Sequence, residues 1–302
     1  NVYAKNAVVH SVKNFDKYVF HLKGDAASAA PMLTLKATDG FGALVDWNGL
    51  DIDTSKLSAS TVLGTTQLLK SEAKNALTFK NYQGRNRTTA ATHGDWETAL
   101  RTDTNAATAS AVLLDYNRFQ NNTTVYDGTK AAYTMPHSDG STTSEIYGGI
   151  SYAGNTTAKN HLTIKNLHQD TDSAYGGKTA GASGSSVKNS VTVAGTGMHA
   201  LKNIYGGYAE NAAHDGAATE NTVTITGGTI SGSIYGGYTS GTGKATGNTV
   251  NLGDASHDRL AAGTNLEHAT LYGGNKENDV TGNTLNVYAK NAVVHSVKNF
   301  DK

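Results

Sequence analysis

Three pairs of acidic residues stand two positions apart in the sequence, a spacing that could place two carboxyl groups on one face of a β-strand. Paired carboxylates can hydrolyse glycosidic bonds or supply oxygen ligands to calcium. The pairs are Asp51 with Asp53, Asp95 with Glu97, and Asp170 with Asp172. None recurs in register with a further acid, and the calcium-binding nonapeptide repeat is missing, so surface carboxylates in turns explain them better. We therefore expect no catalytic residue, no enzyme activity, no metal site and no cofactor, with Asp170 and Asp172 as the one pair considered for calcium.

The composition removes several other kinds of chemistry. The chain has no cysteine, which excludes disulfides, cysteine-ligated zinc and a thiol nucleophile. The sequence also lacks the histidine-pair zinc motif, the serine nucleophile elbow and the glycine-rich phosphate loops. Lysine plus arginine and aspartate plus glutamate both total 25, so there is no basic excess to indicate nucleic acid or an anionic membrane as a partner.

A tyrosine that recurs in the tripeptide Tyr-Gly-Gly is the candidate for binding. Its five copies are spaced by 28, 30, 30 and 37 residues, and an apolar residue precedes each. If that residue points inward, strand alternation points the tyrosine outward, where a row of rings can stack on sugars or partner side chains. Tyrosines that only pack on one another are the alternative, which we favour because the motif recurs at every repeat. The candidate residues of this aromatic strip are Tyr147, Tyr175, Tyr205, Tyr235 and Tyr272.

A second motif runs in phase with the first and predicts the strands that position it. An asparagine is followed by alternating apolar residues, as in residues 221–226, where Val223 and Ile225 share one face. The copies of this motif begin at Asn160, Asn189, Asn221, Asn248 and Asn283.

Together the two motifs predict an all-β fold, a β-solenoid or parallel β-helix with coils of about 30 residues and loop insertions. Stacked coils would share one apolar column, and their strands would pair at about 4.8 Å. Equivalent asparagines can form hydrogen-bonded ladders between coils, and glycines suit the sharp corners. A propeller needs longer blades, a sandwich would not repeat one tripeptide, and the heptads of a coiled coil are missing.

The sequence divides into three parts by the regularity of these motifs. Residues 1–140 predict less regular β-helical coils with long loops, residues 141–285 predict the regular coils, and residues 286–302 predict the start of another unit. Within the first part, residues 65–79 suit two strands better than a helix, and we allow a short helix after Asp95. The least periodic stretch, 82–140, is expected to decorate the coils and to carry recognition.

The two ends of the chain are identical over seventeen residues. Residues 1–17 and residues 286–302 both read NVYAKNAVVHSVKNFDK. Tandem repetition explains this identity and implies an internal piece of a longer protein, while a terminus duplicated by design is the alternative. Under tandem repetition we expect the two copies to form equivalent steps on one continuous solenoid.

Two segments resemble a known family. Residues 230–252 (ISGSIYGGYTSGTGKATGNTVNL) and residues 12–40 (VKNFDKYVFHLKGDAASAAPMLTLKATDG) are similar to repeats of autotransporter-type adhesins, which are surface proteins of Gram-negative bacteria. The resemblance implies a right-handed parallel β-helix, export to the cell surface, and a C-terminal membrane barrel elsewhere in the full protein.

The function predicted on these grounds is that of a structural and adhesive repeat of a large extracellular bacterial surface protein, acting as a stalk that projects or multiplies binding sites. The expected partners are neighbouring tandem units and an unidentified host-cell or bacterial receptor or glycan. Neither nucleic acid nor direct membrane insertion of this segment is expected. A β-helical enzyme that degrades acidic polysaccharide and a self-assembling surface filament are the alternatives.

Overall fold

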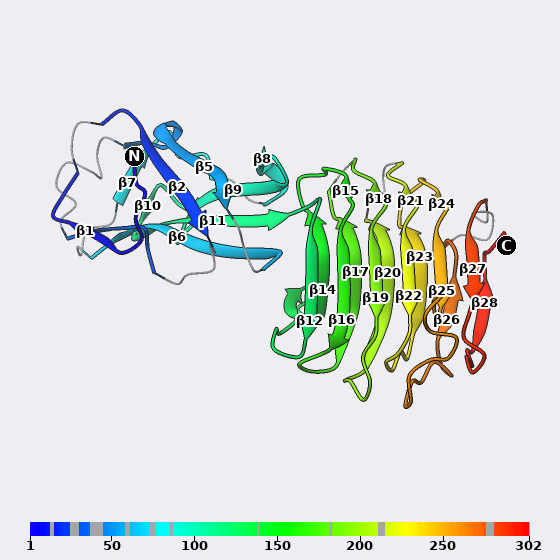
Figure 1. Ribbon diagram of the computed structural model, residues 1–302. Coiled ribbons are helices and arrows are strands. Elements are labelled where there is room, and N and C mark those ends of the chain that lie inside the picture. The colour runs from blue at the N-terminus through cyan, green and yellow to red at the C-terminus, as the bar shows by residue number, and fades with distance from the viewer. Residues whose placement is uncertain are drawn as a thin grey trace. The chain divides into compact units, whose positions relative to one another are not determined.

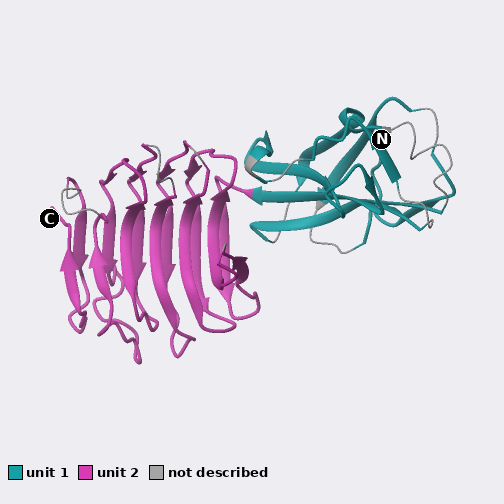
Figure 2. Ribbon diagram, turned by 180° about the vertical axis from the view of Figure 1, so that it is seen from behind, with its two compact units in different colours: residues 1–117 teal, residues 118–302 magenta. Residues whose placement is uncertain are grey.

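The protein is all-β in the computed structural model, which describes residues 1–12, 15–24, 30–36, 45–57, 61–72, 77–84, 87–137, 139–181, 183–210, 215–275 and 281–301. The strands form two compact units, unit 1 (residues 1–117) and unit 2 (residues 118–302), which Figure 2 colours separately. Within the described ranges the helical segments are two short 3-10 turns, η1 (Trp47–Gly49) and η2 (Arg87–Thr89). None of the helices in these ranges is long and apolar enough to cross a membrane.

Unit 2 is a β-solenoid in which three sheets run along the stack of coils (Figure 1). The first sheet contains β12 (Thr123–Asp127), β16 (His161–Asn166), β19 (Ser190–Val193), β22 (Thr222–Ile225), β25 (Thr249–Leu252) and β27 (Thr284–Val287). The second contains β13 (Tyr133–Pro136), β14 (Thr142–Ser151), β17 (Thr171–Thr179), β20 (Leu201–Ala209), β23 (Ser233–Thr239), β26 (Thr270–Tyr272) and β28 (Ser296–Lys298). The third contains β15 (Thr157–Ala158), β18 (Ser186–Val187), β21 (Ala218–Thr219) and β24 (Ala245–Thr246).

Strand register places the repeated motifs directly above one another. In the second sheet Tyr147 pairs with Tyr175, and the line continues in parallel through Tyr205, Tyr235 and Tyr272. The strand pair β13–β14 is antiparallel and forms a hairpin at one edge of that sheet. The predicted solenoid, with coils about 30 residues apart and one line of tyrosines, is therefore confirmed.

The inward faces of the coils form one continuous apolar core. The residues before the tyrosines belong to it, and Ile146, Ala174 and Ile204 are 0% exposed. The alternating residues of the first sheet face them, such as Val223 and Ile225. At about 25 cal/mol per Å² of buried apolar surface, burial of each such side chain contributes roughly 1.5–3 kcal/mol. The tyrosines of the tripeptide are not part of this cluster, as expected from strand alternation.

The recurrent asparagines form a buried ladder, as predicted. Asn160 donates from Nδ2 to Asn189 Oδ1 at 2.8 Å, and its backbone N–H donates to the same oxygen at 3.1 Å. The same two bonds link Asn189, Asn221, Asn248 and Asn283 in turn, at 2.9–3.3 Å. All five side chains are buried, so each amide replaces its water partners with hydrogen bonds to the next coil.

The ladder has one further member that the sequence analysis missed. The backbone N–H of Asn122 donates to Asn160 Oδ1 at 3.2 Å, which extends the ladder by one coil toward the N-terminus. The signal was present, because the residues 122–125 read Asn-Thr-Thr-Val and repeat the asparagine motif.

The two glycines of each tripeptide leave room for this ladder and for the next coil. A Cβ on Gly207 would lie 2.3 Å from Asn221 Nδ2, and one on Gly149 would lie 2.4 Å from Asn160 Nδ2. A Cβ on Gly206 would lie 2.4 Å from the carbonyl oxygen of Gly236 in the following coil. Space therefore selects these glycines, and this explains why the tyrosine and asparagine motifs run in phase.

Unit 1 combines parallel and antiparallel strand pairs. Its sheets follow the orders β1-β3-β6-β11-β9-β8, β10-β7-β4 and β2-β5. The pairs β1–β3, β3–β6, β4–β7 and β2–β5 are parallel, whereas β6–β11, β7–β10 and β8–β9 are antiparallel. The strands are β1 (Ala7–Val9), β2 (Tyr18–Gly24), β3 (Leu33–Leu35), β4 (Val45–Asp46), β5 (Leu50–Leu57), β6 (Leu63–Ser71), β7 (Leu77–Lys80), β8 (Ala91–His93), β9 (Trp96–Thr102), β10 (Thr108–Ala109) and β11 (Ala111–Arg118).

Two local predictions for unit 1 have different outcomes. Residues 65–79 contain strands, β6 and the start of β7, as predicted, while residues 73–76 lie outside the described ranges. The short helix after Asp95 was wrong, because β9 begins at Trp96 and lies between β11 and β8. Trp96 packs edge-on against Tyr116 at 5.9 Å between ring centroids, a contact across the sheet that the local sequence does not show. Residues 118–140 group with unit 2, and the recognition role of 82–140 stays a prediction.

The identical ends do not form equivalent steps, which corrects that expectation. Residues 286–301 continue the solenoid, because β27 pairs with β25 and β28 pairs with β26. The first copy belongs to unit 1, where Val2 bridges to Phe20 and β1 pairs with β3. Asn6 has a positive φ of 61°, whereas its counterpart Asn291 does not. The first copy thus pairs with strands that follow it in the sequence.

Candidate binding surface on the tyrosine columns

The five predicted tyrosines form one stacked column along the solenoid. Neighbouring ring centroids are 5.5, 5.0, 5.2 and 4.6 Å apart from Tyr147 to Tyr272, and neighbouring ring planes are within 16° of parallel. Because parallel in-register strands repeat at about 4.8 Å, equal rings at equal positions must stack at nearly this distance. The structure thus brings all five predicted residues together.

A second column of tyrosines, which the sequence analysis missed, lies beside the first. Tyr208 and Tyr238 stack at 4.8 Å with planes 4° apart, and each meets the first column edge-on. The Tyr205–Tyr208 and Tyr235–Tyr238 contacts are 5.0 and 5.1 Å between centroids. The signal was available, since these two repeats read Tyr-Gly-Gly-Tyr and the last residue lies three positions after the first.

Exposure falls toward the N-terminal end of the columns. Tyr147 is 0% exposed and Tyr175 is 5% exposed, and Tyr133 from β13 lies against Tyr147 at 5.7 Å between centroids. The rings farther along the solenoid are half-buried: Tyr205, Tyr208, Tyr235, Tyr238 and Tyr272. Within the stack each ring covers a face of its neighbour, so the columns offer ring edges and hydroxyl groups to solvent. Whether the aromatic strip binds a ligand stays a prediction.

One buried charged cluster closes the covered end of the columns. Lys178 Nζ lies 3.1 Å from Glu145 Oε2 and 3.6 Å from Glu210 Oε2. The same ammonium lies 4.8 Å from the ring centroid of Tyr175, a cation–π distance. Tyr147 donates its hydroxyl hydrogen to Glu145 Oε2, and the hydroxyl of Thr143 donates to Glu145 Oε1 at 3.1 Å, so both oxygens of this carboxylate have partners. A buried ion pair costs desolvation, and these additional contacts offset part of that cost.

Burial also controls the protonation of the columns. Removal from water raises the pKa of Tyr175, Tyr205 and Tyr208 far above the ordinary phenol value, and neighbouring carboxylates and tyrosines raise it further. These three rings are therefore neutral at physiological pH, and their hydroxyl groups can donate hydrogen bonds.

The acidic pairs of unit 1 are engaged in separate local contacts. Asp51 Oδ2 lies 2.8 Å from Lys17 Nζ, and the hydrogen bond to Lys17 lowers the pKa of that carboxyl. Asp53 Oδ2 lies 2.7 Å from His21 Nδ1, and hydrogen bonds from Ser55, then from His21, lower the pKa of Asp53 to about 2. Both carboxylates therefore stay charged at neutral pH.

Three further acids of these pairs bind different donors through their side chains. Glu97 is fully buried and accepts a hydrogen bond from Asn117 Nδ2 at 2.8 Å. Asp172 Oδ2 accepts from the backbone N–H of Ser144 at 2.8 Å. Asp170 accepts from the backbone N–H of Ala200 at 2.8 Å. Within the described part of the chain, no three acids, histidines or cysteines gather as a metal ion would require.

In comparisons with known proteins, the chain matches no protein-family model, no curated protein and no solved structure.

Proposed function

We propose that this chain is a structural and adhesive repeat of a large extracellular bacterial surface protein, in which the solenoid acts as a stalk that projects or multiplies binding sites. Its partners would be neighbouring units of the same chain and a receptor or glycan on a host or bacterial cell. In this proposal the chain catalyses no reaction, and it is exported to the cell surface.

The observation that carries the proposal is the place of residues 286–302. These residues repeat the start of the chain and form a further coil of the solenoid, paired with β25 and β26. A solenoid that continues into the first residues of a unit is suited to a protein in which such units follow one another in series. The family resemblance of residues 12–40 and 230–252 supports the surface location.

Binding strength as a function of unit number tests this proposal. Chains of one, two and three units, each further unit adding residues 18–302, are applied to glycan arrays and to cultured host and bacterial cells. We expect binding to one surface that strengthens at least about tenfold from one unit to three, because linked sites bind with avidity. Lack of binding to every surface, or binding that does not change with unit number, would contradict the proposal.

The same samples separate the alternatives. A reproducible cleavage product from an acidic polysaccharide would establish an enzyme, and concentration-dependent fibres of the one-unit chain in electron microscopy would establish a filament. The double variant Tyr208→Phe with Tyr238→Phe keeps the ring packing and removes two hydroxyl groups. Loss of binding in this variant would assign the ligand to the tyrosine columns, and unchanged binding would assign it elsewhere, with 82–140 as the next region to vary.

A further inference from the structure

We propose that the end of the solenoid binds residues 1–17 of a second copy of this chain in place of its own residues 286–302. The occupant is defined by the sequence, because the two segments are identical at all seventeen positions. Such an exchange would link copies head to tail. The inference does not require the adhesive function proposed above, since each step concerns the chain's own residues.

The end of the solenoid holds residues 286–302, the second copy of the seventeen-residue segment, by backbone pairing and by side-chain hydrogen bonds. Asn286 Nδ2 donates to Asn251 Oδ1 at 2.9 Å, and the hydroxyl groups of Ser296 and Thr270 are 3.0 Å apart. The backbone N–H of Leu260 donates to the side-chain oxygen of a further segment residue, Asn291, at 2.8 Å. Residues 1–17 carry the same three groups, on Asn1, Ser11 and Asn6.

The apolar side chains of residues 286–302 that contact the solenoid also have identical counterparts in residues 1–17. Ala289 is 3% exposed within the solenoid core, and Ala292, Val294 and Phe300 pack against that core. The counterparts in the first copy are Ala4, Ala7, Val9 and Phe15. The first copy therefore contains every side chain that the solenoid end buries.

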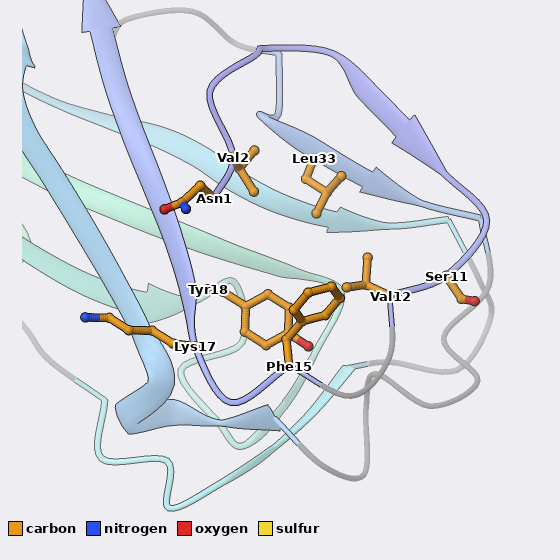
Figure 3. A pocket seen from close by; sticks show the side chains of 8 residues that line it. All are labelled: Asn1, Val2, Ser11, Val12, Phe15, Lys17, Tyr18 and Leu33. Carbon is orange, nitrogen blue, oxygen red and sulfur yellow. The ribbon is translucent and has the colours of Figure 1, made fainter.

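Both copies leave part of their apolar surface exposed. In the first copy Tyr3, Val8 and Phe15 are 67%, 56% and 61% exposed, and in the second copy Val287, Tyr288, Val293 and Val297 are 61%, 45%, 62% and 48% exposed. The copies differ at the alanine that the solenoid buries, because Ala4 is exposed whereas Ala289 is buried. In unit 1 the first copy pairs with β3 through Ala7–Val9 and bridges from Val2 to Phe20. A cavity of about 330 Å³ lies against this segment, and Val2, Val12 and Phe15 are among the residues that line it (Figure 3). Val2, Ala7, Val9 and Val12 also pack against the core of unit 1, so release of residues 1–17 exchanges these contacts for those of the solenoid end.

In the intact chain the solenoid's own segment has the advantage. It is tethered to its site and so acts at an effective concentration that a second molecule does not reach at ordinary dilution. Exchange of identical elements otherwise gives the same local contacts, which is why it is a low-cost route to association. A substitution that weakens only the binding of residues 286–302 should therefore let residues 1–17 of a second molecule bind in their place.

The duplicated sequence supplies matched variants for the test. Ala289→Asp places a carboxylate in the buried position of the tethered copy, whereas Ala4→Asp makes the same change at an exposed position. We expect the apparent mass of A289D to at least double at roughly 0.1 mM in sedimentation, while the wild type and A4D stay monomeric. The double variant A4D/A289D should be monomeric again, because its first copy can no longer fill the site.

Two results would overturn the proposal. They are a monomeric A289D whose circular dichroism shows intact β-structure, and equal association of A289D and A4D/A289D, which would indicate non-specific contacts. Disulfide trapping decides the question if A289D does not fold.

Disulfide trapping provides that second measurement, because the chain has no cysteine of its own. One chain carries Thr270→Cys and another carries Ser11→Cys, whose counterpart Ser296 lies beside Thr270 in the register of β26 and β28. Mixed under slow oxidation at high concentration, the two should form a mixed dimer several-fold faster than T270C does with Ser55→Cys, an exposed serine of unit 1. Equal rates in the two mixtures would overturn the proposal.

Discussion

Each rung of the asparagine ladder joins three coils, because a single side chain serves its neighbours on both sides. Asn221 accepts two bonds from Asn189 and donates from Nδ2 both to Asn248 Oδ1 and to the backbone oxygen of Ser186. The sequence predicted the ladder, since equal spacing of one polar residue among apolar ones is visible without a structure. It did not predict the role of Gly207, because the sequence does not show which neighbouring atom would clash with a side chain at that position.

Substitution of Gly207 by alanine should therefore be severe although the change adds only one methyl group. The added Cβ would lie 2.3 Å from Asn221 Nδ2, so the amide must move and its bonds break. We expect a loss of about 3 kcal/mol in the free energy of unfolding, from overpacking and an unsatisfied buried amide. Urea unfolding of G207A in the wild type and in an Asn221→Ala background measures this. Equal losses in both backgrounds would contradict a direct clash.

The residue that precedes each ladder asparagine has a left-handed backbone. Its φ is 51° at Asn121, 55° at Lys159 and Lys188, 56° at Glu220, 67° at Gly247 and 68° at Gly282. This conformation costs a non-glycine residue about 1–2 kcal/mol, while glycine adopts it freely and asparagine visits it more readily than most residues. Lysine and glutamate at three of these positions are thus tolerated at a cost.

Exchange of residue types at this position should change stability in opposite directions. We expect Lys159→Gly to gain up to about 1 kcal/mol in the free energy of unfolding, after subtraction of the entropy of glycine in the unfolded chain. Gly247→Lys should lose about 1–2 kcal/mol for the reverse reason. Thermal and urea unfolding give both values, and a marked loss in Lys159→Gly would show that its side chain matters more than its backbone.

At the scale of elements, the strand pairing of unit 2 could be predicted and that of unit 1 could not. Val223 and Ile225 alternate with threonines, and the next copy of the motif pairs with them, so the local pattern contains its own partner. In unit 1 the partner is a different sequence, as when Leu69 of β6 pairs with Leu33 on one side and Val112 on the other. The seventeen identical end residues form different elements for the same reason, because the available partner decides the strand.

The tyrosine columns should make the solenoid sensitive to alkali. Burial raises the pKa of Tyr175, Tyr205 and Tyr208 in the folded chain above about 10, the value expected after unfolding. The unfolded chain therefore releases protons that the folded chain keeps, so the contribution of these tyrosines to stability is constant below about pH 10 and falls as pH rises above it.

Tyrosinate absorbance and circular dichroism, recorded together, check this expectation. We expect a group of tyrosines to ionise only as the β-structure is lost, and Tyr205→Phe should shift the transition to higher pH by removing one such group. Ionisation of all tyrosines before any loss of structure would contradict the burial of the columns.

At the scale of the whole molecule, the two identical segments have different structural surroundings. The second copy pairs with β25 and β26 of the solenoid, whereas the first copy pairs with β3 of unit 1. The sequence shows the repeat but not this difference, because identical copies look alike.

A chain of two units, residues 1–302 followed by residues 18–302, allows the surroundings of the two copies to be compared by measurement. We expect alanine-to-aspartate substitution at position 289, in the copy between the two units, to lower the free energy of unfolding by about 3 kcal/mol or more, as a buried charge does. The same change at Ala4 should cost less than about 0.5 kcal/mol, because that alanine is exposed. Equal costs in urea unfolding would show that both copies have the same surroundings.

The parallel register of unit 2 also has a mechanical consequence. Its hydrogen bonds between coils run along the stack, so tension applied along that direction loads them one row at a time and peels coils off in succession. Unfolding of each coil of about 30 residues would release roughly 100 Å of extended chain. A tether of this design lengthens in many small steps under a sudden pull, and it can wind up again when the pull ends.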